Sequence, residues 1–311
     1  MAESATDLTA TADPTTTADL PAAPALPAVR QGADRSRGPG RSTLRRAAGR
    51  PGLLLAVLVL LTALAWACAP DLFTSHDPLA AVPRRTFRPP GPDAWFGTDY
   101  LGRDIYSRVV HGASLSLRAP VIAVGLALVG GTALGLVSGM LGGWCDALLM
   151  RLVDVVLAVP GILLSLAVVT ALGFGTVNVA VAVGVAGIAG FARVTRAEVL
   201  RIRQEPYVEA ARAAGLGRTA VITSHVLPHV AGPVLALAAL ELGTAVLAVS
   251  ALSFLGLGAQ PPAPEWGAMV SEGRNYLGSH WWLTALPGLT IAAVTLSVNR
   301  LARALTHRRA P

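Results

Sequence analysis

The chain has 311 residues, of which 53% are hydrophobic and only 14% charged, and its formal net charge is +7. A soluble domain usually carries about 25% charged residues, so this composition excludes an ordinary soluble protein and indicates a chain surrounded largely by lipid. All 25 basic residues are arginine, which excludes an intact P-loop and lysine Schiff-base chemistry, because both require a lysine.

Residues 1–50 are rich in Ala, Thr, Pro and Asp and then in Arg, and they lack apolar periodicity, so we expect a disordered cytoplasmic tail. The segments that follow define a first helix with a long outer loop (51–118), a five-helix core (119–305) and a short cytoplasmic tail (306–311). Within the core, a cytoplasmic loop at 193–229 separates the fourth and fifth apolar spans.

Six apolar segments come close to the roughly 20 residues that a membrane-spanning helix needs. They are 52–69, 119–141, 152–172, 176–192, 230–256 and 283–299. The predicted fold class is therefore an all-α membrane protein with six transmembrane helices.

The arginines predict the orientation of these helices. With the N-terminus inside, 18 arginines are cytoplasmic and seven are outside, which is the positive-inside bias. Most of the outer arginines lie in the long loop at 70–118, and long loops cross the membrane largely regardless of charge. Because the arginines lie between apolar runs and not in one patch, we expect no nucleic-acid partner.

The end of the outer loop has its own periodicity. Leu101, Ile105 and Val109 are spaced as on one face of a helix within 98–111, with acidic and basic residues between them. This pattern predicts a short amphipathic helix, which either lies on the outer membrane surface or packs on a partner.

Four glycines recur at intervals of four in and after the second span: Gly131, Gly135, Gly139 and Gly143. In lipid, such a stripe allows two helix backbones to approach closely, so we expect tight packing and no chemistry here.

No signature of an enzyme or a metal site is present. The sequence contains neither G-x-S-x-G nor H-E-x-x-H. His225 and His229 are four residues apart, but Pro228 between them should distort the helical turn, and no Cys, Asp or Glu stands close enough to complete a metal site. We predict no catalytic residue, no metal ligand and no cofactor in this chain.

Two acidic residues, Asp154 and Glu241, lie inside predicted spans, where an ionisable side chain is a functional candidate by default. Asp154 follows Arg151 by three residues on the same helical face, so we expect a structural ion pair between them. Glu241 lies deeper and has no partner in its own helix. It either lines a water-filled path or pairs with another subunit, and we take both acids as candidates for a translocation path.

The cytoplasmic loop contains Glu-Pro-Tyr-Val-Glu-Ala-Ala-Arg-Ala-Ala-Gly at residues 205–215. Pro206 suits a first helical turn, the alanines favour a helix, and Gly215 suits a C-terminal stop. We therefore expect a short helix, held away from the bilayer by arginine-rich flanks. A second short helix is expected from about 218 to 225, closed by Leu227-Pro228.

This loop resembles the EAA loop of ABC importer permeases. The matching positions are Glu209, Ala210, Ala211, Gly215, Leu227 and Pro228. His225, where the general pattern often has isoleucine, is similar to the dipeptide/oligopeptide/nickel branch of that family. Further segments resemble the branch in the same order: Phe96–Asp104, Arg151–Pro160, Leu252–Gly258 and Glu265–Gly267. The chain departs from the branch at Val249, where many relatives carry glutamate, and at Ala302-Arg303, where many carry Gly-Asp.

The resemblance covers residues 52–305 and implies the type I ABC importer permease fold, in which five helices form the core and the first wraps a partner. It implies that Pro206, Tyr207 and the EAA positions contact an ATPase subunit, and that this chain is a permease for peptides or a related small solute. The implied partners are a second permease subunit, two ATPase subunits, an extracytoplasmic binding protein and the bilayer. ATP and Mg²⁺ would be bound by the ATPase subunits, and both termini would face the cytoplasm of a bacterial cell.

Three alternatives stay open at this point. A permease of the same family could carry a nickel chelate or another small solute. A secondary transporter could use Glu241 and Asp154, but the EAA-like loop predicts an ATPase partner. A membrane-embedded enzyme would need a nucleophile and a base, and the sequence offers no recognisable pair.

Overall fold

A computed structural model describes residues 51–306. The predicted tail at 1–50 and the residues after 306 lie outside this range. The helices are α2 (Pro51–Cys68), η1 (Pro70–Leu72), η2 (Pro83–Arg85), α3 (Ile105–Leu141), α4 (Gly143–Ala158), α5 (Gly161–Leu172), α6 (Thr176–Ile202), α7 (Pro206–Ala213), α8 (Arg218–Val221), η3 (Ile222–Val226), α9 (Leu227–Phe254), α10 (Trp266–Gly273), η4 (Arg274–Tyr276) and α11 (Trp282–Thr306). Within 51–306 no β-strand forms, which confirms the all-helical prediction.

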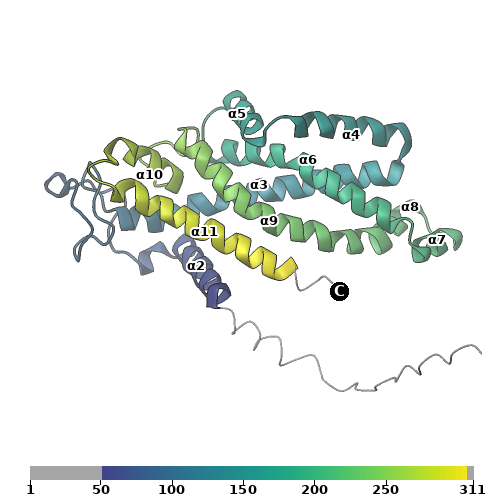
Figure 1. The fold of residues 1–311 in the computed structure, drawn as a ribbon, viewed down its shortest axis with the longest axis horizontal. Helices are drawn as coiled ribbons and strands as arrows, with labels where there is room; N and C mark the ends of the chain where they lie inside the picture. The colour runs from purple at the N-terminus through teal and green to yellow at the C-terminus, as the bar shows by residue number, and fades with distance from the viewer. Residues whose placement is uncertain (1–50, 307–311) are drawn as a thin grey trace, which may run out of the picture. The chain divides into compact units, whose positions relative to one another are not determined.

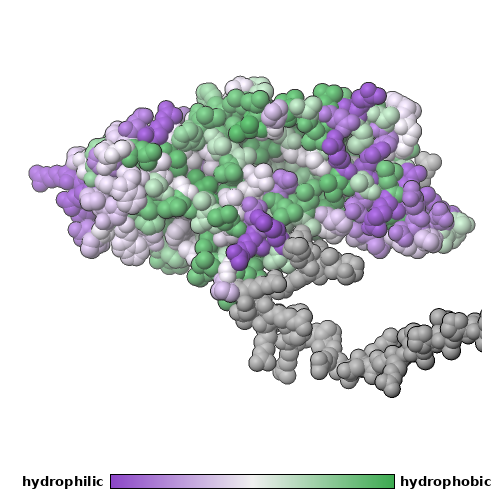
Figure 2. All heavy atoms as spheres, viewed as in Figure 1, coloured by the Kyte–Doolittle hydropathy of each residue, from purple (hydrophilic) through white to green (hydrophobic). Residues whose placement is uncertain are grey.

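Five segments are long and apolar enough to cross a membrane, and they contain α2, α3, α6, α9 and α11. The number becomes six if the bent pair of α4 and α5 counts as one span. Hydrophobic residues gather over the middle of these helices, whereas hydrophilic residues concentrate toward the two ends, near the loop after α2 and near α7 and α8 (Figures 1 and 2). This is the distribution expected of a helical bundle that lies across a bilayer.

The second span is longer than predicted. α3 runs without a break from Ile105 to Leu141 and includes Pro120. The expected surface helix over 98–111 is therefore wrong: Ile105 and Val109 belong to the first turns of α3 and are buried in the core. Their helical spacing reflects burial against other helices, because they belong to the same buried cluster as Trp266 of α10 and Trp282 of α11.

The third span is broken. The sequence predicts one helix over 152–172, but α4 ends at Ala158 and α5 begins at Gly161, with a bend of 95° between them. Pro160 explains the break, since it has no backbone N–H and disfavours helical geometry in the preceding residue. Val159 accordingly has extended backbone angles.

The glycine stripe on α3 lies against α6. A Cβ added at Gly135 would lie 2.6 Å from the Ala192 carbonyl oxygen, and one added at Gly139 would lie 2.7 Å from a methyl carbon of Val199. The two backbones approach closely, as predicted. Gly143 does not belong to this stripe, because it begins α4 and a Cβ there would meet nothing within 4 Å.

One face of α2 packs on α11 and α3, and the rest of the helix is exposed. Its exposed large residues are Leu54, Leu55, Leu58, Leu61 and Leu64. An apolar helix with this much uncovered surface is stable only where lipid or another apolar partner covers it.

Candidate functional site

α7 is the short helix predicted in the loop between the fourth and fifth spans. Pro206 occupies its first turn, where the missing N–H costs nothing. At its end the N–H of Gly215 donates to the Arg212 carbonyl at 2.9 Å, and the N–H of Leu216 donates to the Ala211 carbonyl at 3.2 Å. This is a Schellman cap, and Gly215 adopts the positive φ of +86° that the cap requires. The predicted helix and its glycine stop are confirmed.

A single fully buried side chain anchors α7. Val208 is 0% exposed and belongs to a buried cluster that also contains Phe191 and Ile202 of α6, Val226 of η3 and Val230 of α9. The surrounding residues of α7 lie open: Pro206, Tyr207, Glu209, Ala210 and Arg212 are exposed. The helix therefore presents an uncovered face while it is fixed to the two long helices on either side of it.

The segment after α7 does not close at Leu227-Pro228, so that expectation is wrong. α8 passes into a π-helical turn, Ile222–Val226, and then directly into α9. Pro228 cannot donate a backbone hydrogen bond, and the N–H of Leu227 donates five residues back, to the Ile222 carbonyl. A π-turn of this kind absorbs the irregularity without ending the helix.

The predicted coupling residues come together at one end of the bundle (Figure 1). The ring of Tyr207 on α7 lies 5.4 Å from the ring of His229 and 6.5 Å from that of His225, measured between centroids. Leu227 and Pro228 lie between these histidines in sequence and are exposed. α7 and the first turn of α9 thus form one continuous, partly exposed surface.

A cavity of about 760 Å³ lies between α3, α5, α6 and α9. Most of its lining is alanine, valine, leucine and glycine, together with Ser165 and Thr244. Among the described residues, Glu241 from α9 and Arg193 from α6 are the only ionisable side chains that line it. The structure therefore places Glu241 at a cavity, whereas Asp154 is not part of the lining.

Asp154 pairs with Arg193 and not with Arg151, so the predicted pair within α4 is wrong. The Nη2 atom of Arg193 lies 2.5 Å from Oδ1 of Asp154. Asp154 points from α4 toward α6, and the pair joins the bent third segment to the cavity wall. Arg193 was missed in the sequence because it flanks a span with other arginines and resembles an ordinary topology signal.

A second ion pair fixes α4 to α6. Nε and Nη2 of Arg196 each donate to the Asp146 carboxylate at 2.6 Å, and the Ser138 hydroxyl of α3 donates to the same carboxylate. This arrangement joins three helices, α3, α4 and α6.

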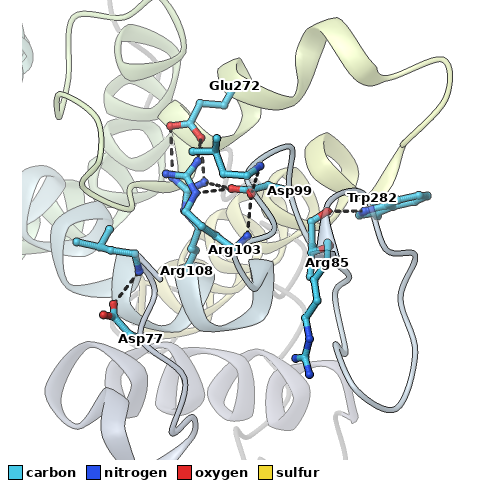
Figure 3. A network of polar contacts seen from close by, with 10 residues as sticks. Asp77, Arg85, Asp99, Arg103, Arg108, Glu272 and Trp282 are labelled. Atoms are coloured by element: carbon cyan, nitrogen blue, oxygen red, sulfur yellow. Dashed lines mark hydrogen bonds and ion pairs between the residues drawn. The ribbon is translucent and has the colours of Figure 1, made fainter. Parts of the chain in front are cut away.

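At the opposite end of the bundle, a four-residue ion cluster joins the loop before α3 to α10 (Figure 3). Arg108 on α3 donates from Nη1 to Asp99 and to Glu272, at 2.9 Å in each case. Arg103 donates from Nε to the same Asp99 oxygen at 2.6 Å and from Nη2 to Glu272 at 3.2 Å. Two carboxylates and two guanidinium groups balance one another in a buried site.

Burial alone would lower the pKa of Arg103, but the carboxylates of Asp99 and Glu272 outweigh it and raise that pKa above its ordinary value. Asp99 also accepts backbone N–H bonds from Leu101 and Arg103, each at 2.9 Å, so its side chain shapes the turn that leads into α3. The cluster consequently fixes the loop between α2 and α3 rigidly to the helical core.

Among residues 51–306, no group of three or more His, Cys, Asp or Glu side chains could hold a metal ion. The rings of His225 and His229 both lie near the ring of Tyr207, and Nδ1 of His229 lies 2.8 Å from the His225 carbonyl oxygen.

Comparisons with known proteins agree on one family. The profile described as "Binding-protein-dependent transport system inner membrane component" matches residues 131–311. The chain is 41% identical to the dipeptide transport system permease protein of Alkalihalophilus pseudofirmus, over 74% of this chain and 76% of that protein. It is 40% identical to the probable D,D-dipeptide transport system permease protein of Escherichia coli, over 78% and 82% of the two chains. It is 41% identical to the glutathione transport system permease protein of Pectobacterium atrosepticum, over 68% and 71%.

Two solved structures share the fold at low sequence identity. A chain of the inward-facing MetNI methionine ABC transporter superposes with a TM-score of 0.51 at 18% identity, over 64% of this chain and 96% of that chain. A chain of an amino acid ABC transporter gives a TM-score of 0.51 at 14% identity, over 66% and 95%.

Proposed function

The chain belongs to the family of binding-protein-dependent inner membrane transport components, and we propose that it forms one half of a translocation path for short peptides. It is a permease subunit of an ATP-driven importer and not an enzyme, because its relatives are permease subunits of such systems. It lies in the inner membrane and works with other components of the importer.

Short peptides are the proposed substrate class. Similar permeases are named for dipeptides, D,D-dipeptides, di- and tripeptides and glutathione, all of which are small peptides. The cavity beside Glu241 supports this assignment, because its volume of about 760 Å³ falls within the roughly 300–1,000 Å³ typical of small-molecule sites. Its lining is largely apolar and would accept varied side chains.

The proposed partners are a second permease subunit, two ATPase subunits that bind ATP and Mg²⁺, and an extracytoplasmic binding protein. The N-terminus and α7 would face the cytoplasm, and the loop after α2 would face the binding protein. The sequence supports this orientation through its arginine bias, since 18 of the 25 arginines would be cytoplasmic.

α7 is the proposed coupling element. The observation that carries this proposal is the anchoring of Val208: it is 0% exposed between α6 and α9, while the remaining face of α7 is open. A helix held in this way moves as one body with the long helices on both sides. Closure of two ATPase subunits against α7 would therefore rock α6 and α9, whose side chains line the cavity.

The test is reconstitution of this chain with the second permease, the ATPase subunits and the binding protein in proteoliposomes. Uptake of a labelled dipeptide should require ATP, the binding protein and this chain together. Uptake that continues without the ATPase subunits, driven by an ion gradient, would reject the proposal in favour of secondary transport.

A further inference from the structure

Glu241 is an acidic residue near the middle of the apolar helix α9, and its carboxylate has no partner in the described part of the chain. No hydrogen bond or ion pair joins it to any residue between 51 and 306. The side chain is partly exposed and lines the cavity between α3, α5, α6 and α9. A carboxylate so placed in a membrane helix is costly unless a cation or water reaches it.

The charge of the cavity is unbalanced because of Glu241. Arg193 is the other ionisable lining residue among those described, and Asp154 already neutralises it at 2.5 Å. Ser165 offers little to a ligand, since its hydroxyl donates to the Gly161 carbonyl of its own helix. What remains is a mostly apolar space with one acidic side chain on its wall that no cation among the described residues neutralises.

We propose that Glu241 is the transient counter-ion for the free α-ammonium group of the peptide during its passage. The assignment rests on the proposed peptide import, and it names the group by which the path would recognise its substrate. Every peptide with an unblocked amino terminus carries this cation, whatever its side chains. The apolar walls would then tolerate sequence variety, while one carboxylate orients the chain.

A single contact of this kind suits transport. A path must bind its solute well enough to admit it and weakly enough to release it. One charge-assisted contact on an otherwise apolar wall meets both conditions, whereas a fully enclosed site with many polar contacts would retain the peptide. The competing arrangement is a fixed cation on the second permease subunit that pairs permanently with Glu241.

The experiment uses the complete importer in proteoliposomes, with binding protein at saturating concentration. Glu241→Gln keeps the size of the side chain and removes its charge. We expect uptake of an unblocked dipeptide per ATP hydrolysed to fall on the order of tenfold. ATP hydrolysis and co-purification of the second permease should remain normal. A dipeptide analogue without the amino group is the second substrate, supplied at concentrations that fully load the binding protein. The unmodified importer should carry this analogue slowly, and Glu241→Gln should carry it at the same slow rate.

A second variant distinguishes the moving ammonium group of a peptide from a fixed cation on the second permease subunit. Thr244 lines the same cavity three residues further along α9, so Thr244→Glu in the Glu241→Gln background returns a carboxylate to the wall one turn away. Recovery of uptake supports a substrate cation, because a moving ammonium group can meet either position. Thr244→Gln in the same background is the matched control and should not recover uptake.

Three results would overturn the assignment: unchanged uptake in Glu241→Gln, no recovery with Thr244→Glu, or loss of the second permease from the purified complex. The last result would identify a fixed pair between subunits. Failure of the unmodified importer to take up any peptide with ATP would instead reject the proposed function itself, so the two failures are distinguishable.

Discussion

Arg108 in the first turns of α3 donates two hydrogen bonds to the carboxylate of Glu272 on α10, from Nη1 at 2.9 Å and from Nη2 at 3.3 Å. The two residues are 164 positions apart, and the Arg108 side chain is only 2% exposed. Nη1 of the same guanidinium also donates to Asp99 at 2.9 Å. Through Arg108, the loop before α3, which carries Asp99, is therefore joined to α10 in the last third of the chain.

Removal of this guanidinium should destabilise the protein strongly. Arg108→Met keeps the apolar stem but leaves two carboxylates to share Arg103. Breaking a buried ion pair costs about 3–5 kcal/mol, so the apparent melting temperature of the purified protein in detergent should fall clearly. Arg84→Met is the matched control, because Arg84 is exposed in the same loop. Equal melting temperatures for the two variants would contradict a structural role for the cluster.

The contact between α3 and α6 should be sensitive to one methyl group. At Gly135 a Cβ would lie 2.6 Å from both the Ala192 carbonyl oxygen and the Thr195 Cβ. Gly135→Ala should therefore force the helices apart and cost about 1–3 kcal/mol of stability. Gly125→Ala on the same helix is the control, since a Cβ there meets nothing within 4 Å. Thermal unfolding of both variants in detergent measures the difference, and a control that loses as much stability as Gly135→Ala would refute the packing argument.

The sequence predicted the elements whose signals are local. Apolar length located the spans, and Pro206 and Gly215 marked the ends of α7, because helix capping depends only on residues nearby. The break between α4 and α5 also had a local signal, Pro160, but apolar residues on both sides of it concealed the bend.

The contacts between distant segments could not be read from the sequence. The spacing of Ile105 and Val109 is the same for a surface helix and for the start of a buried one, and only contact with α10 and α11 distinguishes the two. Asp154 had a plausible partner within its own helix, yet the bend after α4 leaves it facing Arg193, 39 positions away. Pairing of this kind depends on tertiary structure, which spacing does not encode.

Asp104 should make the stability of the protein depend on pH. Burial raises the pKa of this carboxyl above its ordinary 3.8, despite the hydrogen bond from the Ser107 N–H. Its Oδ1 atom is buried without a hydrogen-bond partner. A raised folded-state pKa favours the protonated form in the folded protein, so the stability linked to this group is complete below about pH 3.8 and is lost as pH rises through the folded pKa.

Asp104→Asn keeps an oxygen that can accept the Ser107 N–H and removes the charge. We expect the variant to be at least as stable as the unmodified protein at pH 7, with a smaller gain in melting temperature on acidification. Asp93→Asn controls for the change in net charge, because Asp93 is exposed in the same loop. If the melting temperature of Asp104→Asn equals that of the unmodified protein at every pH from 4 to 8, Asp104 contributes nothing to the pH dependence of stability.

The proposed orientation can be measured by cysteine labelling in intact cells. Cys68 and Cys145 are free thiols and must first be replaced. Single cysteines at Ala80 and Gly278, both exposed, should then react with a membrane-impermeant maleimide added outside. A cysteine at Gly217, exposed beside α7, should react only after the cells are opened. External labelling at Gly217 would reverse the proposed topology.

Gly215 offers the sharpest test of the coupling assignment. Its φ of +86° strains any residue with a Cβ, although a Cβ there would meet no atom within 4 Å. Gly215→Val should thus cost about 1 kcal/mol or more at the cap of α7, through backbone strain and not through a clash. That cost is too small to unfold the helical bundle, but it would misplace a helix that must fit a partner.

We therefore expect Gly215→Val to remain in the membrane at a normal level, to co-purify weakly with the ATPase subunits and to take up less peptide per ATP hydrolysed. Gly217→Val is the matched control: Gly217 is also exposed and a Cβ there also meets nothing within 4 Å, but it lacks the positive φ. If uptake and co-purification fall to the same extent in both variants, added bulk is responsible and the geometry of the cap is not. If neither variant changes them, α7 is an ordinary connection, and ATPase closure must reach α6 and α9 through another surface of the chain.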